Sequence, residues 1–334
     1  MKRVLYFCVA MGIVGWLATL GAPSMAQAET YDLVIQGGRV LDPETNFDQV
    51  ANVGVNGGRI AVITKDKIEG KETIDAKGLV VAPGFIDGHQ HCIDPYQYRL
   101  MLRDGRTTLL DTEIGAHGPK LDEWYKRREG KAPVNFGVAV AHEFARAEVL
   151  DGFTDWKYLY TPDAARTRLK DGWSKTRPNL EQGNQILALI DEGLQLGGLG
   201  IGSTVGYMRA GVSAREIFEL QKLGGLYGRF ICMHFRYTPG DDTTEVNGIQ
   251  EMLANAAALG TPAIASHFNN SGYNMVHELL VRMRERGYNV WGEIYPYAAG
   301  STALNAVFLE PEVWVQALGH KYEDTVQDVA TGEL

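Results

Sequence analysis

The sequence predicts an α/β fold in which a parallel sheet is covered by helices on both faces. From Val80 onward, apolar strand candidates alternate with segments of helical periodicity. The later strand candidates begin about 30 residues apart, which is the length of a βα unit. They are uninterrupted apolar runs, as expected of buried parallel strands. A composition of 45% hydrophobic and 22% charged residues over 334 positions fits a globular protein with a substantial core.

The first 28 residues have the pattern of a secretory signal peptide. Lys2 and Arg3 precede the apolar run Val4–Leu20, and small residues close the segment at Ala26–Ala28. This pattern predicts cleavage after Ala28 and a secreted or periplasmic protein. The alternative, an N-terminal membrane anchor, is less favoured because the apolar run is barely long enough to span a bilayer.

Charge and cysteine content bear on the partners. Loss of the two basic residues with the signal peptide changes the formal net charge from −9 to −11. This acidic balance gives no reason to expect a nucleic acid or, after signal cleavage, a membrane as partner. Once Cys8 has left with the signal, Cys92 and Cys232 remain, which is too few for a disulfide framework. A bridge or a thiolate ligand stays an alternative, but two small buried side chains are favoured.

The segment 29–80 is expected to form a small β unit before the main domain, 81–334. Its strand candidates are Tyr31–Ile35, Ala51–Val55 and Arg59–Ile63, with Asp-Pro and Gly-Gly pairs at the turns.

The main domain is expected to contain strands at Val80–Ile86, Asn135–Ala141, Gly198–Ser203, Arg229–His234, Pro262–His267 and Asn289–Tyr295. Helices are predicted between the later strands. Ser213–Glu216 has the sequence of a capping box, and an apolar helix face follows it. Two further helices are predicted from Ile249 to Gly260 and from Val276 to Gly287.

Five of the eight histidines fall at the carboxyl ends of predicted strands: His89, His91, His142, His234 and His267. In a (β/α)₈ barrel this edge is where active sites are built. His89 and His91 are two residues apart, so in an extended chain they point the same way and can bind one ion together. A lone His-x-His pair is a weak signal, but strand-end histidines on four predicted strands favour a metal site. The others, His117, His277 and His320, follow no predicted strand and are expected in the core or in solvent.

Several segments resemble the amidohydrolase superfamily, and more narrowly its N-acyl-D-amino-acid deacylases, the D-aminoacylases. The segments that carry this resemblance are Tyr31–Pro43, Ala82–His91, Gly105–Leu110, Ala141–Arg146, Pro262–His267 and Tyr295–Thr302. The last of them, which begins Tyr-Pro-Tyr, is typical of the deacylase branch. The resemblance extends from Tyr31 to about Trp314.

The resemblance implies a (β/α)₈ TIM barrel of the metal-dependent hydrolase type, with residues 29–80 as part of a flanking β-sandwich. Gly105–Leu110 resembles the family's second strand and brings the predicted barrel strands to seven. The chain departs from the family pattern because the eighth strand, with its catalytic aspartate, is missing. Asp324 and Asp328 lie in a polar tail and follow no apolar strand, so no general base is assigned. The chain resembles a protein truncated at its C-terminus, and such a chain alone is expected to be poorly stable and to have little or no activity.

The resemblance also implies the metal ligands of a site for one or two Zn²⁺ ions. His89 and His91 would bind at one position, and His234 and His267 at the other. The family often has a cysteine at the end of the second strand, where this chain has Ile114. Glu113 is therefore the expected carboxylate ligand or bridge, as in the subset resembling N-acyl-D-glutamate deacylases. Asp111 is the alternative, and a surface or capping role remains an alternative for either acid.

The implied reaction is hydrolysis of the amide bond of N-acyl-D-amino acids by a metal-activated hydroxide, which releases a D-amino acid and a carboxylate. Arg236 is the candidate for binding the substrate carboxylate, and Arg146 is the alternative. Tyr295 and Tyr297 are candidate donors to the substrate, although packing around Pro296 is the alternative. His142 and Arg146 are expected to support the site from outside the ligand set.

Two other functions stay open. One is a different amide hydrolase of the superfamily, such as a dihydropyrimidinase, hydantoinase or isoaspartyl dipeptidase. Those relatives use a carboxylated lysine at the end of the fourth strand, and Gly200–Thr204 contains no lysine. The other is a non-catalytic periplasmic protein that binds a metal or a ligand. The residues do not specify the acyl group, the D-amino acid or the oligomeric state.

Overall fold

The computed structural model describes residues 30–91, 95–153, 170–236, 248–268, 273–297, 299–300, 302, 306, 309–317, 319–327 and 331–332. The chain divides into two compact units, Met1–Pro83 and Gly84–Leu334. The expected signal peptide, Cys92 and Asp328 lie outside the described residues. Within the described part of the chain, no helix is long and apolar enough to span a bilayer.

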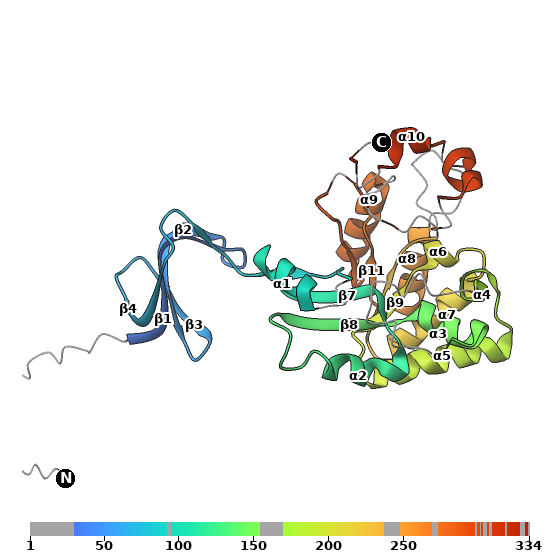
Figure 1. The fold of residues 1–334 in the computed structure, drawn as a ribbon, viewed down its shortest axis with the longest axis horizontal. Coiled ribbons are helices and arrows are strands. Elements are labelled where there is room, and N and C mark those ends of the chain that lie inside the picture. Colours follow the sequence, from blue (N-terminus) through green and yellow to red (C-terminus); the bar gives the residue numbers. More distant parts are fainter. Residues whose placement is uncertain are drawn as a thin grey trace, which may run out of the picture. The chain divides into compact units, whose positions relative to one another are not determined.

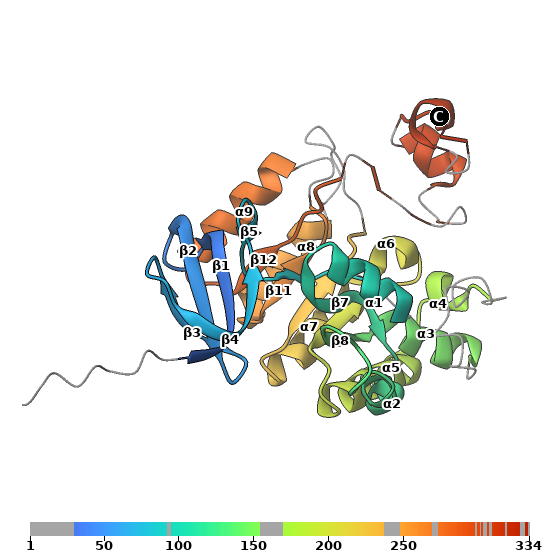
Figure 2. The same cartoon turned by 60° about the vertical axis from the view of Figure 1, so that its left-hand side comes forward.

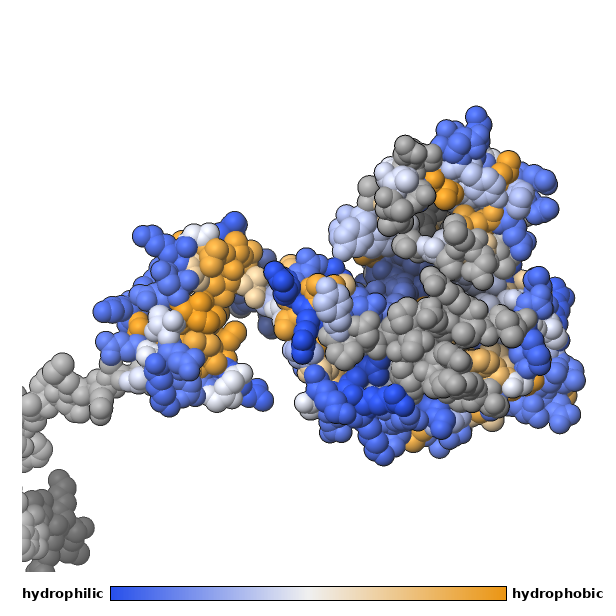
Figure 3. Space-filling view, viewed as in Figure 1, coloured by the Kyte–Doolittle hydropathy of each residue, from blue (hydrophilic) through white to orange (hydrophobic). Residues whose placement is uncertain are grey.

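The first unit is a small β structure built on one long strand, β1. Its strands are β1 (Thr30–Asp42), β2 (Phe47–Asn56), β3 (Arg59–Thr64), β4 (Glu69–Asp75) and β5 (Val80–Val81). β1 pairs antiparallel with β2 and parallel with β4 and β5, and β3 lies beyond β2. Val40, Ala51 and Val53 form its buried core. Figure 3 shows hydrophobic side chains at the surface of this unit, where Val50 and Ile60 are among the exposed apolar residues.

The second unit is built on a parallel sheet that has seven strands among the described residues, in the order β12-β11-β10-β9-β8-β7-β6. The strands are β6 (Phe85–Asp87), β7 (Arg106–Ala116), β8 (Asn135–Ala141), β9 (Gly200–Ser203), β10 (Phe230–Met233), β11 (Ala263–Ala265) and β12 (Val290–Gly292). Neighbours in the chain are neighbours in the sheet, which is the topology of a (β/α) barrel (Figure 1). The predicted α/β fold class, with a separate small sheet, is confirmed.

The sheet is curled. Its two edge strands are β6 and β12, yet Nδ1 of His89, just after β6, lies 2.5 Å from Oε1 of Glu293, just after β12. A flat sheet of this width would hold its edges far apart, because neighbouring strands lie about 4.8 Å apart. The curl therefore brings the carboxyl ends of the first and last strands of the sheet together.

Helices follow the strands, and α1, α3, α5, α7, α8 and α9 among them contact strands of the sheet (Figure 2). They are α1 (Pro95–Arg103), α2 (Leu121–Lys126), α3 (His142–Asp151), α4 (Gly172–Lys175), α5 (Leu180–Gln195), α6 (Val205–Met208), α7 (Ala214–Leu226), α8 (Gly248–Leu259), α9 (Tyr273–Glu285) and α10 (Tyr322–Thr325). A 3₁₀ turn spans Gly118–Lys120 and a π-helix spans Glu312–Ala317. The main core lies between these helices and the strands, where Ile190, Ile201 and Ile231 are buried together.

Two sequence predictions need correction. The single strand expected at Val80–Ile86 is divided, because β5 pairs with β1 of the first unit and β6 belongs to the parallel sheet. The break contains Pro83, which has no N–H to donate to a strand partner. The expectation that His117 follows no strand is also wrong, because β7 runs to Ala116. His117 is buried, with Nε2 2.7 Å from Oε2 of Glu148, while His277 and His320 are exposed.

The predicted capping box at the start of α7 is only half formed. Ser213 Oγ accepts a hydrogen bond from the Glu216 backbone N–H at 3.2 Å. The Glu216 side chain does not return to the cap, because it binds the buried side chains of His142 and Arg146. A capping residue has therefore become part of a buried polar network.

Replacing a core residue of α5 should destabilise the second unit. Ile190 is fully buried against the sheet, so Ile190→Ala leaves a cavity and should lower the free energy of unfolding by about 2–5 kcal/mol. Leu180 lies on the same helix and is 78% exposed, so Leu180→Ala should change it by less than about 0.5 kcal/mol. Urea unfolding followed by circular dichroism measures both. Equal effects of the two substitutions would contradict this assignment of the core.

Candidate metal centre

Five predicted site residues meet at the carboxyl ends of the strands. His89 and His91 follow β6, Glu113 lies near the end of β7, His234 follows β10 and His267 follows β11. They form two groups that share Glu113, one with His89 and His91 and the other with His234 and His267. In each group the candidate ligand atoms lie within 4.8 Å of one another. The structure thus brings together all five residues that the sequence predicts as metal ligands.

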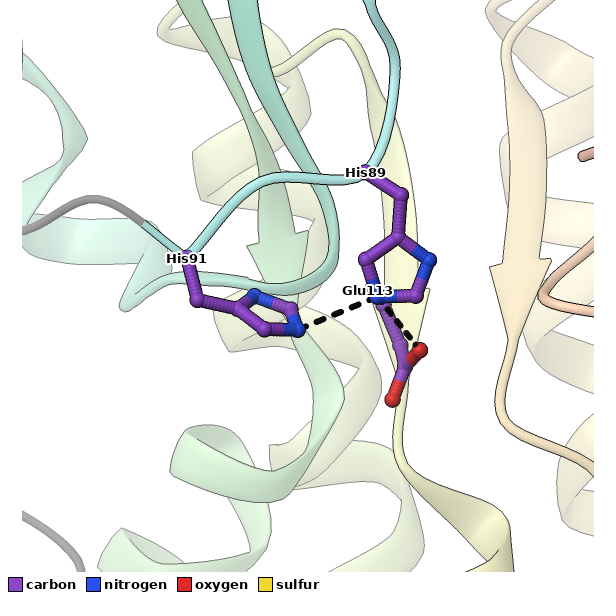
Figure 4. Close-up of side chains that lie close together, drawn as sticks. All are labelled: His89, His91 and Glu113. Carbon is purple, nitrogen blue, oxygen red and sulfur yellow. Dashed lines mark hydrogen bonds and ion pairs between the residues drawn. The ribbon is translucent and has the colours of Figure 1, made fainter. Parts of the chain in front are cut away.

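Glu113 is the centre of the cluster. Glu113 is only 3% exposed, and its carboxylate faces imidazole nitrogens on several sides. Oε2 lies 2.8 Å from His89 Nε2 and 3.1 Å from His267 Nε2, and Oε1 lies 3.2 Å from His234 Nδ1. Figure 4 shows the His89 ring between the carboxylate of Glu113 and the ring of His91. One carboxylate therefore connects the two groups of histidines.

The backbone around Glu113 is irregular, and close packing holds it. The pairing of β7 with β8 shifts register between Asp111 and Ala116, so the segment that carries Glu113 bulges. Asp111 Oδ1 accepts the backbone N–H groups of Ile114 and Gly115 at 3.1 and 3.0 Å, which fixes the bulge. Gly202 of β9 packs so closely that a Cβ there would lie 2.4 Å from the carbonyl oxygen of Glu113. A bulge is a common way to aim a side chain into an active site.

The histidines face one another through their ring nitrogens. His89 Nε2 lies 3.0 Å from His91 Nε2, and His267 Nε2 lies 2.9 Å from His234 Nδ1. His267 also has a φ of 30°, which is uncommon for a residue other than glycine. Such strained backbone is often found where a side chain must be held in a functional position.

These residues fit a divalent metal ion. Glu113 Oε2 is buried and, among the described residues, makes no hydrogen bond of good geometry, although imidazole nitrogens surround it. A buried carboxylate in that position is costly unless a cation compensates it. Imidazole nitrogens and carboxylate oxygens are ligands that zinc and similar transition metals accept.

The charged groups of the cluster shift one another's pKa values. Burial alone would lower the pKa of His89, but the carboxylates of Glu113 and Glu293 beside its ring outweigh burial and raise the pKa to about 11. Burial would raise the pKa of Glu113, but the surrounding His234, His267 and His89 hold it well below its usual range. Burial would also lower the pKa of His91, but the nearby carboxylate of Asp111 outweighs burial and raises it. Without a metal ion, Glu113 is therefore ionised, and the raised pKa of His89 places a positive charge beside it.

His142 and Arg146 form a separate buried network on α3. Because a carboxylate only accepts, His142 Nε2 donates to Glu216 Oε1 at 2.9 Å, and its Nδ1 accepts the Ser203 hydroxyl at 2.8 Å. Arg146 donates to the same Glu216 oxygen at 2.6 Å and to two backbone carbonyls in the segment after α3. Burial lowers the pKa of His142, so it stays neutral. Neither side chain belongs to the groups that could hold the ion.

The predicted substrate-binding residues lie outside the cluster. Arg236 pairs with Glu251 at 3.2 Å and donates to the carbonyl oxygens of Arg209 and Val212. Tyr295 and Tyr297 stack with ring centroids 6.4 Å apart. The hydroxyl of Tyr297 accepts from Arg106 Nη2 at 3.1 Å. A substrate-binding role for these three residues stays a prediction.

The remaining candidates are also placed. The alternative ligand Asp111 caps the β7 bulge and lies 3.3 Å from His91 Nδ1, so it supports a histidine from outside the cluster. Cys232 is free and buried, and burial raises the pKa of its thiol, so it stays protonated. Asp324 is exposed on α10.

Sequence reasoning missed two residues of the site. Glu293 follows β12 and binds His89, but the predicted strand ran to Tyr295 and covered it. Its position at the carboxyl end of a strand was the available signal. Tyr207 on α6 packs on the ring of His234 with centroids 4.7 Å apart, and burial raises its pKa to about 12. The predicted strand Gly198–Ser203 ends just before α6, so the position of Tyr207 near the carboxyl end of a strand was again the available signal.

Comparisons with known proteins agree with this geometry. The chain is 28% identical to the D-aminoacylase of Alcaligenes xylosoxydans xylosoxydans over 307 residues, which cover 84% of this chain and 60% of that protein. The crystal structure of an N-acyl-D-glutamate deacylase from Bordetella bronchiseptica, with zinc and a phosphonate inhibitor, has a TM-score of 0.67 and 24% identity, and covers 90% of this chain and 63% of that one. A crystal structure of D-aminoacylase has a TM-score of 0.65 and 25% identity, with 86% and 62% covered. No family model matches the chain.

The fold and these relatives place the chain in the amidohydrolase superfamily. Within the superfamily they place it in the D-aminoacylase group, as the sequence resemblance predicted. The chain spans about 60% of the length of the curated relatives that it matches over most of its own length.

Removing the charge at the centre of the cluster should weaken metal binding. Glu113→Gln keeps the size of the side chain but removes the carboxylate that faces the histidines. The affinity for Zn²⁺, measured by competition with a chromophoric chelator, should fall by more than the ~10–100-fold typical of groups outside the ligand set. Glu143 is also buried and binds Thr204, so Glu143→Gln is the matched control and should retain the ion. Unchanged zinc affinity in Glu113→Gln would remove Glu113 from the ligands.

Metal binding should depend on pH in a defined direction. His89 has a pKa of about 11 without the ion, so it carries a proton at neutral pH that a metal ligand must lose. Binding should therefore release protons, and affinity should fall as the pH decreases. Titration of Zn²⁺ into weakly buffered protein with a pH indicator measures the release, and the metal-loaded protein is the control. Proton-free binding with an affinity independent of pH would contradict the raised pKa of His89.

Proposed function

We propose that this protein hydrolyses the amide bond of N-acyl-D-amino acids in a metal-dependent reaction, releasing a D-amino acid and a carboxylate. The observation that carries the proposal is the convergence of four histidines on the buried Glu113 at the carboxyl end of the parallel sheet. The relatives support the substrate class, because they are a D-aminoacylase and an N-acyl-D-glutamate deacylase. The solved deacylase contains zinc and an inhibitor described as a mimic of the tetrahedral intermediate.

The five clustered residues would hold the metal. His89 and His91 would bind on one side of Glu113, and His234 and His267 on the other. A divalent ion bound there supplies Lewis acidity, which lowers the pKa of a coordinated water towards ~7 and polarises the amide carbonyl. Glu113 belongs to both groups, so the five residues could hold one ion or two, and one solved D-aminoacylase is described as having a binuclear metal centre.

The surrounding residues would arrange the reactants. The His234 side of the site is bounded by the Tyr207 ring, whose pKa of about 12 keeps its hydroxyl protonated and able to donate a hydrogen bond. Tyr295 lies after β12, in the segment that follows Glu293. We assign no general acid or base among the described residues. We also propose that residues 1–28 direct the protein to the periplasm or outside the cell.

Turnover of paired enantiomers tests the reaction. Because the 334-residue chain alone is expected to have little activity, the Zn²⁺-loaded chain is incubated at high concentration and for a long time with N-acetyl-D-amino acids and with their L enantiomers, and the released amine is measured. We expect release from D substrates only, and none after a chelator has removed the metal. Glu113→Gln should abolish the release and Glu143→Gln should retain it. Equal release by wild type and Glu113→Gln would reject a metal-dependent hydrolase.

Kinetics of Arg236→Ala test the proposed carboxylate-binding role. A charged hydrogen bond contributes about 1.5–3 kcal/mol, so its loss should raise KM for N-acyl-D-amino acids roughly 10–100-fold. Arg282→Ala is the control, because Arg282 is an exposed arginine paired with Glu278 on α9. An unchanged KM in Arg236→Ala would restrict Arg236 to its bonds with Glu251 and the two carbonyl groups.

A further inference from the structure

Glu293 connects the two edges of the curled sheet. It directly follows β12, one edge strand, and its side chain reaches the histidine that follows β6, the opposite edge strand. Its backbone is fixed in register, because Glu293 N donates to the Ala265 carbonyl at 3.0 Å and Phe268 N donates to the Glu293 carbonyl at 3.1 Å. Its side chain is 23% exposed. The carboxylate is therefore presented by a fixed backbone from the rim of the metal centre.

One carboxylate oxygen contacts both halves of the centre. Glu293 Oε1 lies 2.5 Å from Nδ1 of His89 and accepts the backbone N–H of His267 at 2.6 Å. His89 belongs to the group containing His91, and His267 belongs to the group containing His234. Apart from Glu113, this side chain joins an imidazole of the first group to the backbone of the second.

The contact also determines which nitrogen of His89 faces the ion. A carboxylate only accepts hydrogen bonds, so Nδ1 of His89 must carry the proton. Nε2 is then the nitrogen left for a metal ion, and it is the atom that lies 2.8 Å from Glu113 Oε2 and 3.0 Å from His91 Nε2. A carboxylate behind a metal-binding imidazole fixes the orientation of the ring and makes it a better ligand.

We propose that Glu293 is a positioning residue of the metal centre, which holds His89 with Nε2 towards the ion and holds His267 in its strained backbone conformation. The inference rests on the proposed function only in that the cluster binds a metal ion. Glu293 acts through the two histidines and belongs to neither group of candidate ligands.

Metal affinity of two conservative variants tests the proposal. Glu293→Gln removes the charge but keeps an amide oxygen that can accept from His89 Nδ1 and from the backbone of His267. Glu293→Asp keeps the charge but is one methylene shorter, so it withdraws the oxygen from both partners. Glu285→Asp on the exposed end of α9 is the matched control. Zn²⁺ affinity is measured by chelator competition, the ligand set by the visible spectrum of the Co²⁺ form, and folding by the unfolding midpoint of the metal-free protein.

We expect Glu293→Asp to bind Zn²⁺ about 10–100-fold more weakly and to alter the Co²⁺ spectrum, while Glu293→Gln recovers most of the affinity. Glu285→Asp should match wild type. Wild-type affinity in Glu293→Asp would overturn the proposal. Weak binding by Glu293→Gln with normal binding by Glu293→Asp would also overturn it, because the charge and not the position of the oxygen would then matter.

The outcome separates this inference from the proposed reaction. A wild-type chain that binds no metal overturns both. A wild-type chain that binds Zn²⁺ but hydrolyses no N-acyl-D-amino acid overturns the reaction, and the affinities of the Glu293 variants still decide the positioning role.

Discussion

A buried negative charge at the end of a parallel sheet governs this structure. Glu113 has almost no access to water, so its carboxylate must be compensated within the protein. Imidazole nitrogens face it on several sides, and the raised pKa of His89 places a positive charge beside it. The bulge of β7, the glycine contact from β9 and the positive φ of His267 bring these groups together.

The topology explains how such distant residues meet. The four histidines follow three different strands, β6, β10 and β11, and parallel strands end at one rim of the sheet. The curl of the sheet then brings the first strand near the last, which a flat sheet cannot do. A second buried network, formed by His142, Arg146 and Glu216, ties α3 to the start of α7. This network is separate from the Glu113 cluster, which is the candidate metal centre.

Much of the fold and of the histidine cluster could be predicted, because short stretches of the sequence indicate where a buried strand runs and where it ends. The strand Asn135–Ala141 was predicted with its observed bounds, since an uninterrupted apolar run leaves little choice of register. The four clustered histidines followed from the rule that parallel strands end at one rim. The break at Pro83 and the length of β7 were missed, because strand bounds depend on partners in space. Glu293 was missed for the same reason, since its role is defined by His89, 204 residues away.

That separation has a consequence for biosynthesis. A chain emerging from the ribosome makes His89 and His91 early, but the carboxylate that orients His89 arrives only after β12 has been synthesised. Contacts between such distant residues form late, because closing a long loop costs entropy before any favourable contact is made. An ion captured by the first histidine pair alone would be held by an incomplete set of ligands. The candidate metal centre is therefore complete only at the end of folding, after the sheet has curled.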